Sequence, residues 1–126
     1  MSRESSMRPD SGQPAGDVVA EIRTTFPTRQ DAVACGTRLV EQGLAACVQI
    51  EGPLTSVYRW HDAVQTAEEF ACRWKTIPFK LAECEVAIRA AHPYDTPEIL
   101  VSFCRGSADY AAWVQESIVA DREPRS

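Results

Sequence analysis

The segment "TSVYRWHDAVQTAEEFACRWKT" (residues 55–76) decides the fold. Its two runs, "TSVYRWHDA" and "TAEEFACRWKT", are rich in β-branched and aromatic residues and are typical of paired strands. We predict a β-hairpin with its turn near Asp62–Gln65. The second run, residues 66–76, would extend roughly 37 Å at about 3.4 Å per residue, whereas a typical strand has about 5 to 6 residues. Unless a bulge breaks it, the hairpin must extend beyond its own sheet.

A hairpin that extends beyond its sheet exposes backbone groups without partners. Soluble proteins usually cover such edges by pairing them with a neighbouring chain. The hairpin alone therefore predicts a homo-oligomer.

Upstream of the hairpin the pattern changes from strand to helix and back. "DVVAEIRTTF" (residues 17–26) alternates with the period of a strand that is buried on one face. Thr28 follows as a helix cap, and apolar residues at helical spacing predict a helix that continues until Gly43. "LAACVQI" (residues 44–50) is small and apolar enough to be a second strand inside the sheet.

Downstream of the hairpin a second helix is expected, and Pro78 fits its first turn. Its predicted buried stripe consists of Leu81, Cys84, Ile88 and Ala91. His92 ends this helix, because a residue before proline is pushed out of the helical region. "ILVSFC" (residues 99–104) is another strand, and Ser107 begins a final helix.

The predicted order is β-α-β-β-α-β with an extra C-terminal helix, which is an α+β fold of the ferredoxin-like, split βαβ type. Helices on one face of an antiparallel sheet leave the other face uncovered. The strands carry Val, Ile, Cys and aromatic residues on both faces, so we expect something else to cover the second face.

The chain of 126 residues is expected to form one domain, residues 18–121. Residues 1–17 are rich in Ser, Pro, Gly and charge and are predicted to be a disordered tail, and "REPRS" at the other end a frayed terminus. The tail lacks the apolar stretch of a secretory signal, so a cytoplasmic location is expected.

Two classes of partner are disfavoured by the composition. No apolar run approaches the roughly 18 residues that would span a bilayer, so the sequence predicts no membrane segment. The formal net charge is −5 and the thirteen basic residues are scattered, which argues against nucleic acid as a partner.

Five cysteines, an odd number with no C-x-x-C pair, are read as free thiols in a reducing compartment. Cys35, Cys72, Cys84 and Cys104 lie at helix-stripe or strand positions, so we expect buried thiols there. Cys47 is also expected in a strand, but it remains a candidate ligand for a soft metal.

"HPYDTPEI" (residues 92–99), here called the octet, is either a stiff turn or a binding site. Its two prolines restrict the backbone, which serves both readings. A turn does not require Tyr94 or Glu98. A neutral His92 could bind a metal, and Glu98 could supply an oxygen ligand or bond a polar ligand.

Three other places hold candidate binding residues. Tyr58 and Trp60 share one face of the hairpin, where they serve sheet packing or an interface between subunits. Lys75 ends the hairpin and is either a solvated charge or a ligand contact. Tyr110 and Trp113, three residues apart, lie on one face of the last helix.

Taken together, the fragments resemble the CutA family of divalent-cation tolerance proteins. The fragments are "TTFPTRQDA", "LVEQGLAACVQI", "SVYRW", "KT", "HPYDTPEI" and "DYAAW". They follow the family order over roughly residues 18 to 118. Two departures stand out: Asp62 occupies a place where the family usually has glycine, and "FACRW" is less aliphatic than the usual return strand.

The resemblance implies a ferredoxin-like subunit in a tight homotrimer built like the PII signalling proteins, with hairpins that reach across subunits. It implies a cytosolic protein associated with tolerance to copper and other divalent metals, with no organic cofactor. Family-matching residues would gather in clefts between subunits: Cys47, Tyr58, Trp60, Lys75, His92, Tyr94, Glu98 and Trp113. Of these, Cys47, His92 and Glu98 are the candidate metal ligands.

Three functional hypotheses remain open from the sequence. The first is a non-enzymatic trimer that binds a divalent cation, copper above others, or a small anionic ligand. The second is a structural or signalling scaffold that binds a partner protein, in which the octet is only a turn. The third is an enzyme with His92 as base and Lys75 or Tyr94 as acid, but a nucleophile and an orienting group are missing.

Overall fold

The computed structural model describes residues 17–122. Its elements are β2 (Val18–Phe26), α1 (Arg29–Glu41), β3 (Cys47–Trp60), β4 (Ala63–Thr76), the 3₁₀ turn η2 (Pro78–Lys80), α2 (Leu81–Ala91), β5 (Leu100–Arg105) and α3 (Ala108–Arg122). The predicted order of strands and helices is confirmed. The predicted tail and frayed end lie almost wholly outside the described residues.

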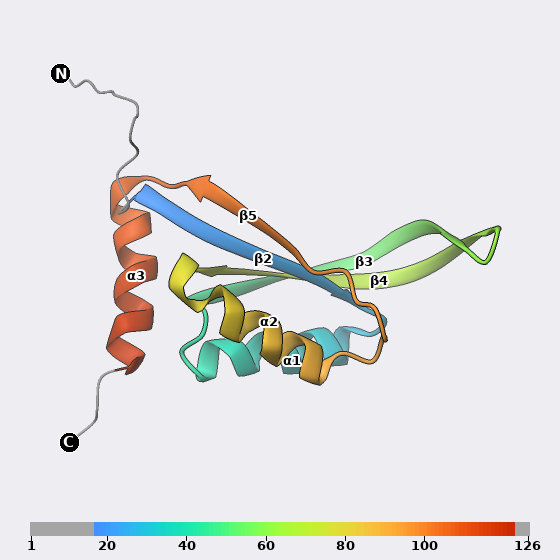
Figure 1. The fold of residues 1–126 in the computed structure, drawn as a ribbon, viewed down its shortest axis with the longest axis horizontal. Coiled ribbons are helices and arrows are strands. Elements are labelled where there is room, and N and C mark those ends of the chain that lie inside the picture. Colours follow the sequence, from blue (N-terminus) through green and yellow to red (C-terminus); the bar gives the residue numbers. More distant parts are fainter. Residues whose placement is uncertain (1–16, 123–126) are drawn as a thin grey trace.

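Four strands form one sheet in the order β3-β4-β2-β5, and each neighbouring pair is antiparallel. Helices α1 and α2 lie on one face of this sheet, and α3 stands across one end of it (Figure 1). The fold is therefore α+β, with a helix-covered face and an opposite face, here called the open face.

The first helix begins where the sequence predicts. The Thr28 hydroxyl accepts a hydrogen bond from the Asp31 amide at 3.0 Å, which satisfies one of the free N–H groups at the helix start. The helix ends at Glu41, and Gly43 follows with a φ of 74°, a conformation that glycine adopts without strain.

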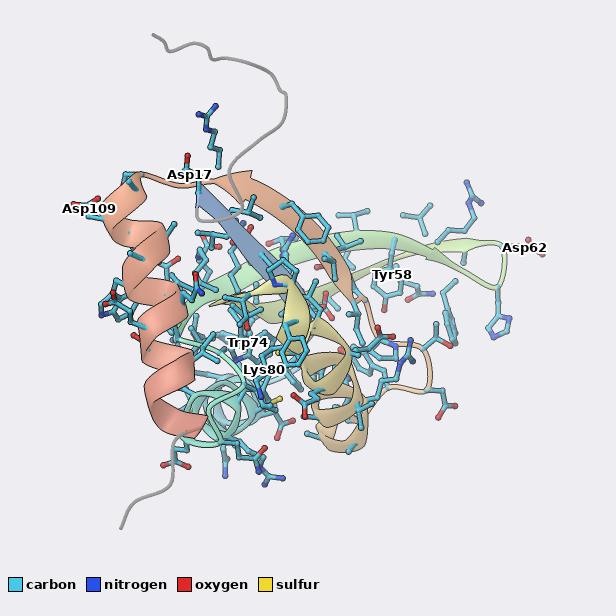
Figure 2. All side chains as sticks on the ribbon, turned by 60° about the vertical axis from the view of Figure 1, so that its left-hand side comes forward. Asp17, Tyr58, Asp62, Trp74, Lys80 and Asp109 are labelled. Atoms are coloured by element: carbon cyan, nitrogen blue, oxygen red, sulfur yellow. The ribbon has the colours of Figure 1, made fainter. Side chains whose placement is uncertain are left out.

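The core lies between the sheet and the two helices that cover it. Trp74 is fully buried there, and its indole N–H donates to the Gly36 carbonyl oxygen at 3.2 Å (Figure 2). Cys35, Cys72 and Cys84 belong to the same cluster. Burial raises the pKa values of these thiols to about 11, 12 and 11, so they stay protonated and behave as small apolar groups.

Several burial expectations need correction. Cys104 is exposed, because β5 is an edge strand and all six of its residues are exposed in the single chain. Ala91 is exposed at the end of α2, although Cys84 and Ile88 of the same predicted stripe are buried. Strand β2 is also partly buried on the open face, because Val19 there packs against α3.

The hairpin turn is tighter than predicted. Trp60 pairs with Ala63, so the turn consists of His61 and Asp62 rather than residues 62–65. Both turn residues have positive φ angles, 49° and 66°, as a type I′ turn requires. Glycine usually marks such a turn, and its absence from the sequence explains the error in position.

The predicted extension beyond the sheet is confirmed. Strand β2 pairs with β4 only between Phe70 and Thr76, and residues 63–69 of β4 pair with β3 alone. The two-stranded part, residues 54–69, is here called the ribbon; it extends away from the helices, with Asp62 at its tip (Figures 1 and 2). Val57, Trp60 and Val64 on it are 60–65% exposed.

The ribbon leaves the sheet at a bulge, where the pairing of β3 with β4 shifts between Glu51 and Leu54. Gly52 lies in this bulge with a φ of 155°. A Cβ atom at Gly52 would lie 2.4 Å from Cδ2 of Phe70 and 3.1 Å from the Glu69 carbonyl oxygen. Close approach of the two strands therefore requires glycine at this position.

We expect Gly52→Ala to lower the free energy of unfolding by about 1–3 kcal/mol, because the new methyl group overlaps a buried ring. Gly36→Ala is the comparison, since its Cβ would meet only side-chain methyl groups of Val48 and Ile50 at 3.3–3.4 Å. Alanine also favours a helix over glycine by about 1 kcal/mol. Chemical denaturation measures both, and an equal or smaller loss for Gly52→Ala would contradict the packing argument.

Candidate functional site

The open face carries polar side chains in cross-strand rows. One row contains Glu21, Lys75 and Cys47, which are directly opposite one another on β2, β4 and β3. Strand residues alternate between faces, and the neighbouring row of Ile22, Trp74 and Val48 belongs to the core. The first row therefore projects from the open face.

Around this row lies the first candidate site, here called the thiol cluster: Cys47, Lys75, Glu21, Gln49 and Tyr110. The Lys75 ammonium donates to Oε1 of Gln49 at 3.0 Å and lies 3.4 Å from a Glu21 carboxylate oxygen. The side chains of this ion pair are only 18% and 19% exposed, so solvent screens it weakly. Lys75 is thus a held cation rather than a freely solvated charge.

Helix α3 completes the thiol cluster. The Tyr110 hydroxyl lies 3.7 Å from the Cys47 sulfur, a hydrogen bond in which either group can donate, and the Tyr110 ring stacks on Trp113 at 5.8 Å. Burial, the contact with Cys47 and the negative charge of Glu21 raise the pKa of Tyr110 to about 12. Tyr110 therefore remains a neutral phenol beside a half-exposed thiol.

The second candidate site, here called the octet cluster, joins the octet loop to β4: His92, Tyr94, Glu69, Ser56 and Thr25. The Tyr94 hydroxyl donates to one carboxylate oxygen of Glu69 at 3.0 Å, and the Ser56 hydroxyl donates to the other at 2.7 Å. Burial and this bond to Glu69 raise the pKa of Tyr94 to about 12.

Both ring nitrogens of His92 are engaged. Nδ1 accepts a hydrogen bond from the Tyr94 backbone N–H at 3.2 Å, and Nε2 lies 2.7 Å from the Thr25 carbonyl oxygen. A carbonyl oxygen only accepts, so Nε2 carries the proton and the ring is neutral. The ring also stacks on Phe26 at 4.4 Å. Its lone pair is therefore in use, and binding a metal would require breaking the bond to Tyr94.

The remaining candidate residues lie outside both clusters. Glu98 lies 3.7 Å from Arg23 and is partly exposed. Tyr58 and Trp60 project from the ribbon, and Trp60 makes an edge contact with His61 at 4.8 Å. The positions of Tyr58 and the ribbon tip are visible in Figure 2.

The structure separates the candidate metal ligands. Cys47 lies in the row of Glu21, whereas His92 bonds to Thr25, four residues further along β2, or about 14 Å at about 3.4 Å per residue. Among the described side chains, those of residues 17–118, no three His, Cys, Asp or Glu residues form a group that could hold a metal ion. A single chain therefore does not bring Cys47, His92 and Glu98 together.

Sequence reasoning missed five members of the clusters: Glu21, Thr25, Gln49, Ser56 and Glu69. No local motif marks them, because each joins a cluster through a partner on another element. Glu69 stands beside Glu68 on a strand that also carries Arg73 and Lys75, so its charge gave no distinguishing signal in the sequence.

Comparison with known proteins gives a consistent match. The model of the family described as CutA1 divalent ion tolerance protein matches residues 20–117. Divalent-cation tolerance protein CutA from Thermus thermophilus is 35% identical over 97 residues, which are 76% of this chain and 94% of the relative. Its counterpart from Archaeoglobus fulgidus is 36% identical over 98 residues, 77% and 95% of the two chains.

Solved structures agree with the sequence comparison. The divalent ion tolerance protein CutA1 from Ehrlichia chaffeensis superposes with a TM-score of 0.76 at 33% identity, covering 79% of this chain and 94% of the other. The structure described as the periplasmic divalent cation tolerance protein CutA from Archaeoglobus fulgidus also gives 0.76, at 35% identity and 79% and 98% coverage.

The protonation of His92 gives a test of the octet cluster. Burial lowers the pKa of His92 below its ordinary value of 6.5, more than the Thr25 carbonyl and the charges of Glu69 and Asp31 raise it. Between the pKa of His92 in the folded chain and its value of 6.5 in the unfolded chain, the unfolded chain binds more protons. The contribution of neutral His92 to stability is therefore complete above pH 6.5 and decreases as the pH falls below it.

We therefore expect the stability advantage of the wild type over His92→Gln to shrink as the pH falls from about 7.5 to 5. Chemical denaturation at several pH values measures this difference. An NMR titration, with His92 assigned by means of His61→Asn, gives the pKa directly. A His92 pKa at or above 6.5, or a difference in stability that grows in acid, would contradict the proposed bonding.

Proposed function

Because the chain belongs to the CutA1 family of divalent ion tolerance proteins, we propose that it acts in tolerance to divalent metal cations as a homotrimer. Its clefts between subunits would bind a divalent cation, copper above others, or a small ligand. We also assign the subunit to the ferredoxin-like class, since the order of its elements is β-α-β-β-α-β with a further helix.

One observation carries the assembly: the chain leaves strand edges and apolar residues uncovered. The ribbon extends beyond the sheet, and every residue of β5 is exposed, including Leu100, Val101 and Phe103. Exposed edges and apolar patches of this kind are usually covered by another chain. The number three rests on the resemblance of the sequence to a family of trimers.

The metal proposal depends on the assembly. One chain alone does not fit a metal ion, because its candidate ligands lie apart. Among the three candidate ligands, Cys47 is the soft donor, and it is half-exposed and bonds only weakly to Tyr110. Donors from a neighbouring subunit, such as Glu98 or a rearranged His92, would complete the set. Among divalent first-row metals, copper binds most such sites of nitrogen, oxygen and sulfur most tightly.

The competing hypotheses have less support. As a general base, His92 would need a free ring nitrogen, and both nitrogens are engaged. A scaffold that binds a partner protein needs no ligand, but it does not account for the held Lys75 beside Cys47. A cytoplasmic location stays a prediction. None of the helices in residues 17–122 is long and apolar enough to cross a membrane.

Assembly is tested by placing charges on the ribbon. The wild type should show three times the chain mass of 13.9 kDa in light scattering. Val57→Lys combined with Val64→Lys should shift the mass towards a single chain, because buried ammonium groups are costly. Val86→Lys on α2 is the control, since Val86 is equally exposed, at 69%, on the helix layer. A trimer unaffected by the ribbon charges, or a monomeric wild type, would contradict the proposal.

Metal binding is tested by native mass spectrometry of reduced, chelator-stripped protein titrated with copper. We expect three copper ions per wild-type trimer and reduced uptake in Cys47→Ser and in His92→Ala. Cys104→Ser is the matched control, because it removes an exposed thiol outside both clusters. Equal uptake by all variants would argue against the site. Equal loss in Cys104→Ser would instead indicate unspecific binding to exposed thiols.

A further inference from the structure

We propose that the octet holds the start of the ribbon and so fixes the direction in which the ribbon leaves the sheet. The contacts that do this, from Tyr94 and Ser56 to Glu69, are here called the clasp. The proposal concerns the conformation of the chain itself and does not require a bound metal. It gives Tyr94 and Glu69 a shared role that neither the family description nor the candidate metal set assigns to them.

The clasp acts at the root of the ribbon. Phe70 is the last residue of β4 that pairs with β2, so Glu69 is the first residue that the sheet no longer holds. On β3 its partner is Leu54, the first paired residue after the bulge. A tie to Glu69 is therefore placed where a small change of angle produces the largest movement of the tip.

The hydroxyl groups of Tyr94 and Ser56 both bind Glu69, and each donates to a different carboxylate oxygen. Tyr94 donates to Oε2 from the octet, and Ser56 donates to Oε1 from the ribbon. The carboxylate thus connects a loop and a strand that are distant in sequence. Bonds to an ionised carboxylate are stronger than neutral ones, and Glu69 is partly shielded from solvent.

The octet is itself fixed to the sheet, so the residue that binds Glu69 is held in position. His92 bonds to the carbonyl oxygen of Thr25 and stacks on Phe26, at the end of β2. The same ring accepts the backbone N–H of Tyr94. Tyr94 is therefore positioned by β2, through His92, before it reaches Glu69.

Helix α1 supplies a second set of contacts at the root of the ribbon. The Arg29 guanidinium donates to the Gly52 carbonyl oxygen at 2.9 Å and lies over the Phe70 ring at 5.0 Å. Both contacts fall on the bulge where the ribbon begins. The root is thus held by α1 and by the octet. A ligand that drew the Tyr94 hydroxyl away from Glu69 would break the contact with the octet, and the ribbon would become more mobile.

Hydrogen exchange followed by mass spectrometry tests the clasp. Tyr94→Phe and Ser56→Ala each remove one donor to Glu69 and no other atom. We expect amide exchange in residues 54–69 to become about tenfold faster in each variant, with β2 unchanged. Tyr110→Phe is the matched control, since it removes a phenol hydroxyl too, but at the thiol cluster. It should leave amide exchange in the ribbon unchanged.

The measurement is made at equal oligomeric state, checked by light scattering, so that loss of assembly is not mistaken for release of the clasp. Exchange within twofold of the wild type in both donor variants would overturn the proposal. So would a uniform increase along the whole chain, or equal acceleration by Tyr110→Phe, because each indicates general destabilisation instead of a local tie.

Discussion

The mismatch of strand lengths is the constraint on which the structure depends. Strands β3 and β4 have fourteen residues each, whereas β2 has nine and β5 has six. A sheet can only be as long as its shorter members allow, so about half of each long strand must continue as an isolated ribbon. Isolated two-stranded ribbons are marginally stable in water. The contacts at its root, and the surfaces that a neighbour would cover, are consequences of this mismatch.

The two faces of the sheet meet different requirements. The helix-covered face is an apolar core around Trp74. The open face is charged but balanced: Arg23 lies directly opposite Arg73, an arrangement that is unfavourable by itself. Glu98 lies 3.7 Å from the first and Glu51 lies 3.3 Å from the second. Exposed pairs of this kind contribute little to stability, so they serve mainly to offset the repulsion between the two arginines.

Local chemistry could be predicted from the sequence, and long-range contacts could not. Thr28 caps α1 and His92 ends α2 as predicted, because each effect depends only on adjacent residues. The turn was misplaced because His61 and Asp62 adopt left-handed angles without glycine. The exposure of Cys104 was missed because a strand sequence does not say whether the strand lies at an edge. Tyr94 was identified as a candidate, but its partner Glu69 lies 25 residues away on another element.

The proposed metal site depends on the proposed assembly, because the candidate ligands lie apart on a single chain. If Cys47 alone bound a cation on one chain, the site would be an exposed thiol with a phenol beside it, and its affinity would be that of any such thiol. A specific site needs more ligands in fixed positions. His92 is already fixed, but by bonds that use both nitrogens, whereas the Glu98 side chain is 41% exposed and lies 3.7 Å from Arg23. In the proposed assembly, the Glu98 carboxylate of a second subunit would need less rearrangement than the His92 imidazole to complement Cys47, and a metal bound between subunits would in turn stabilise the assembly that creates its site.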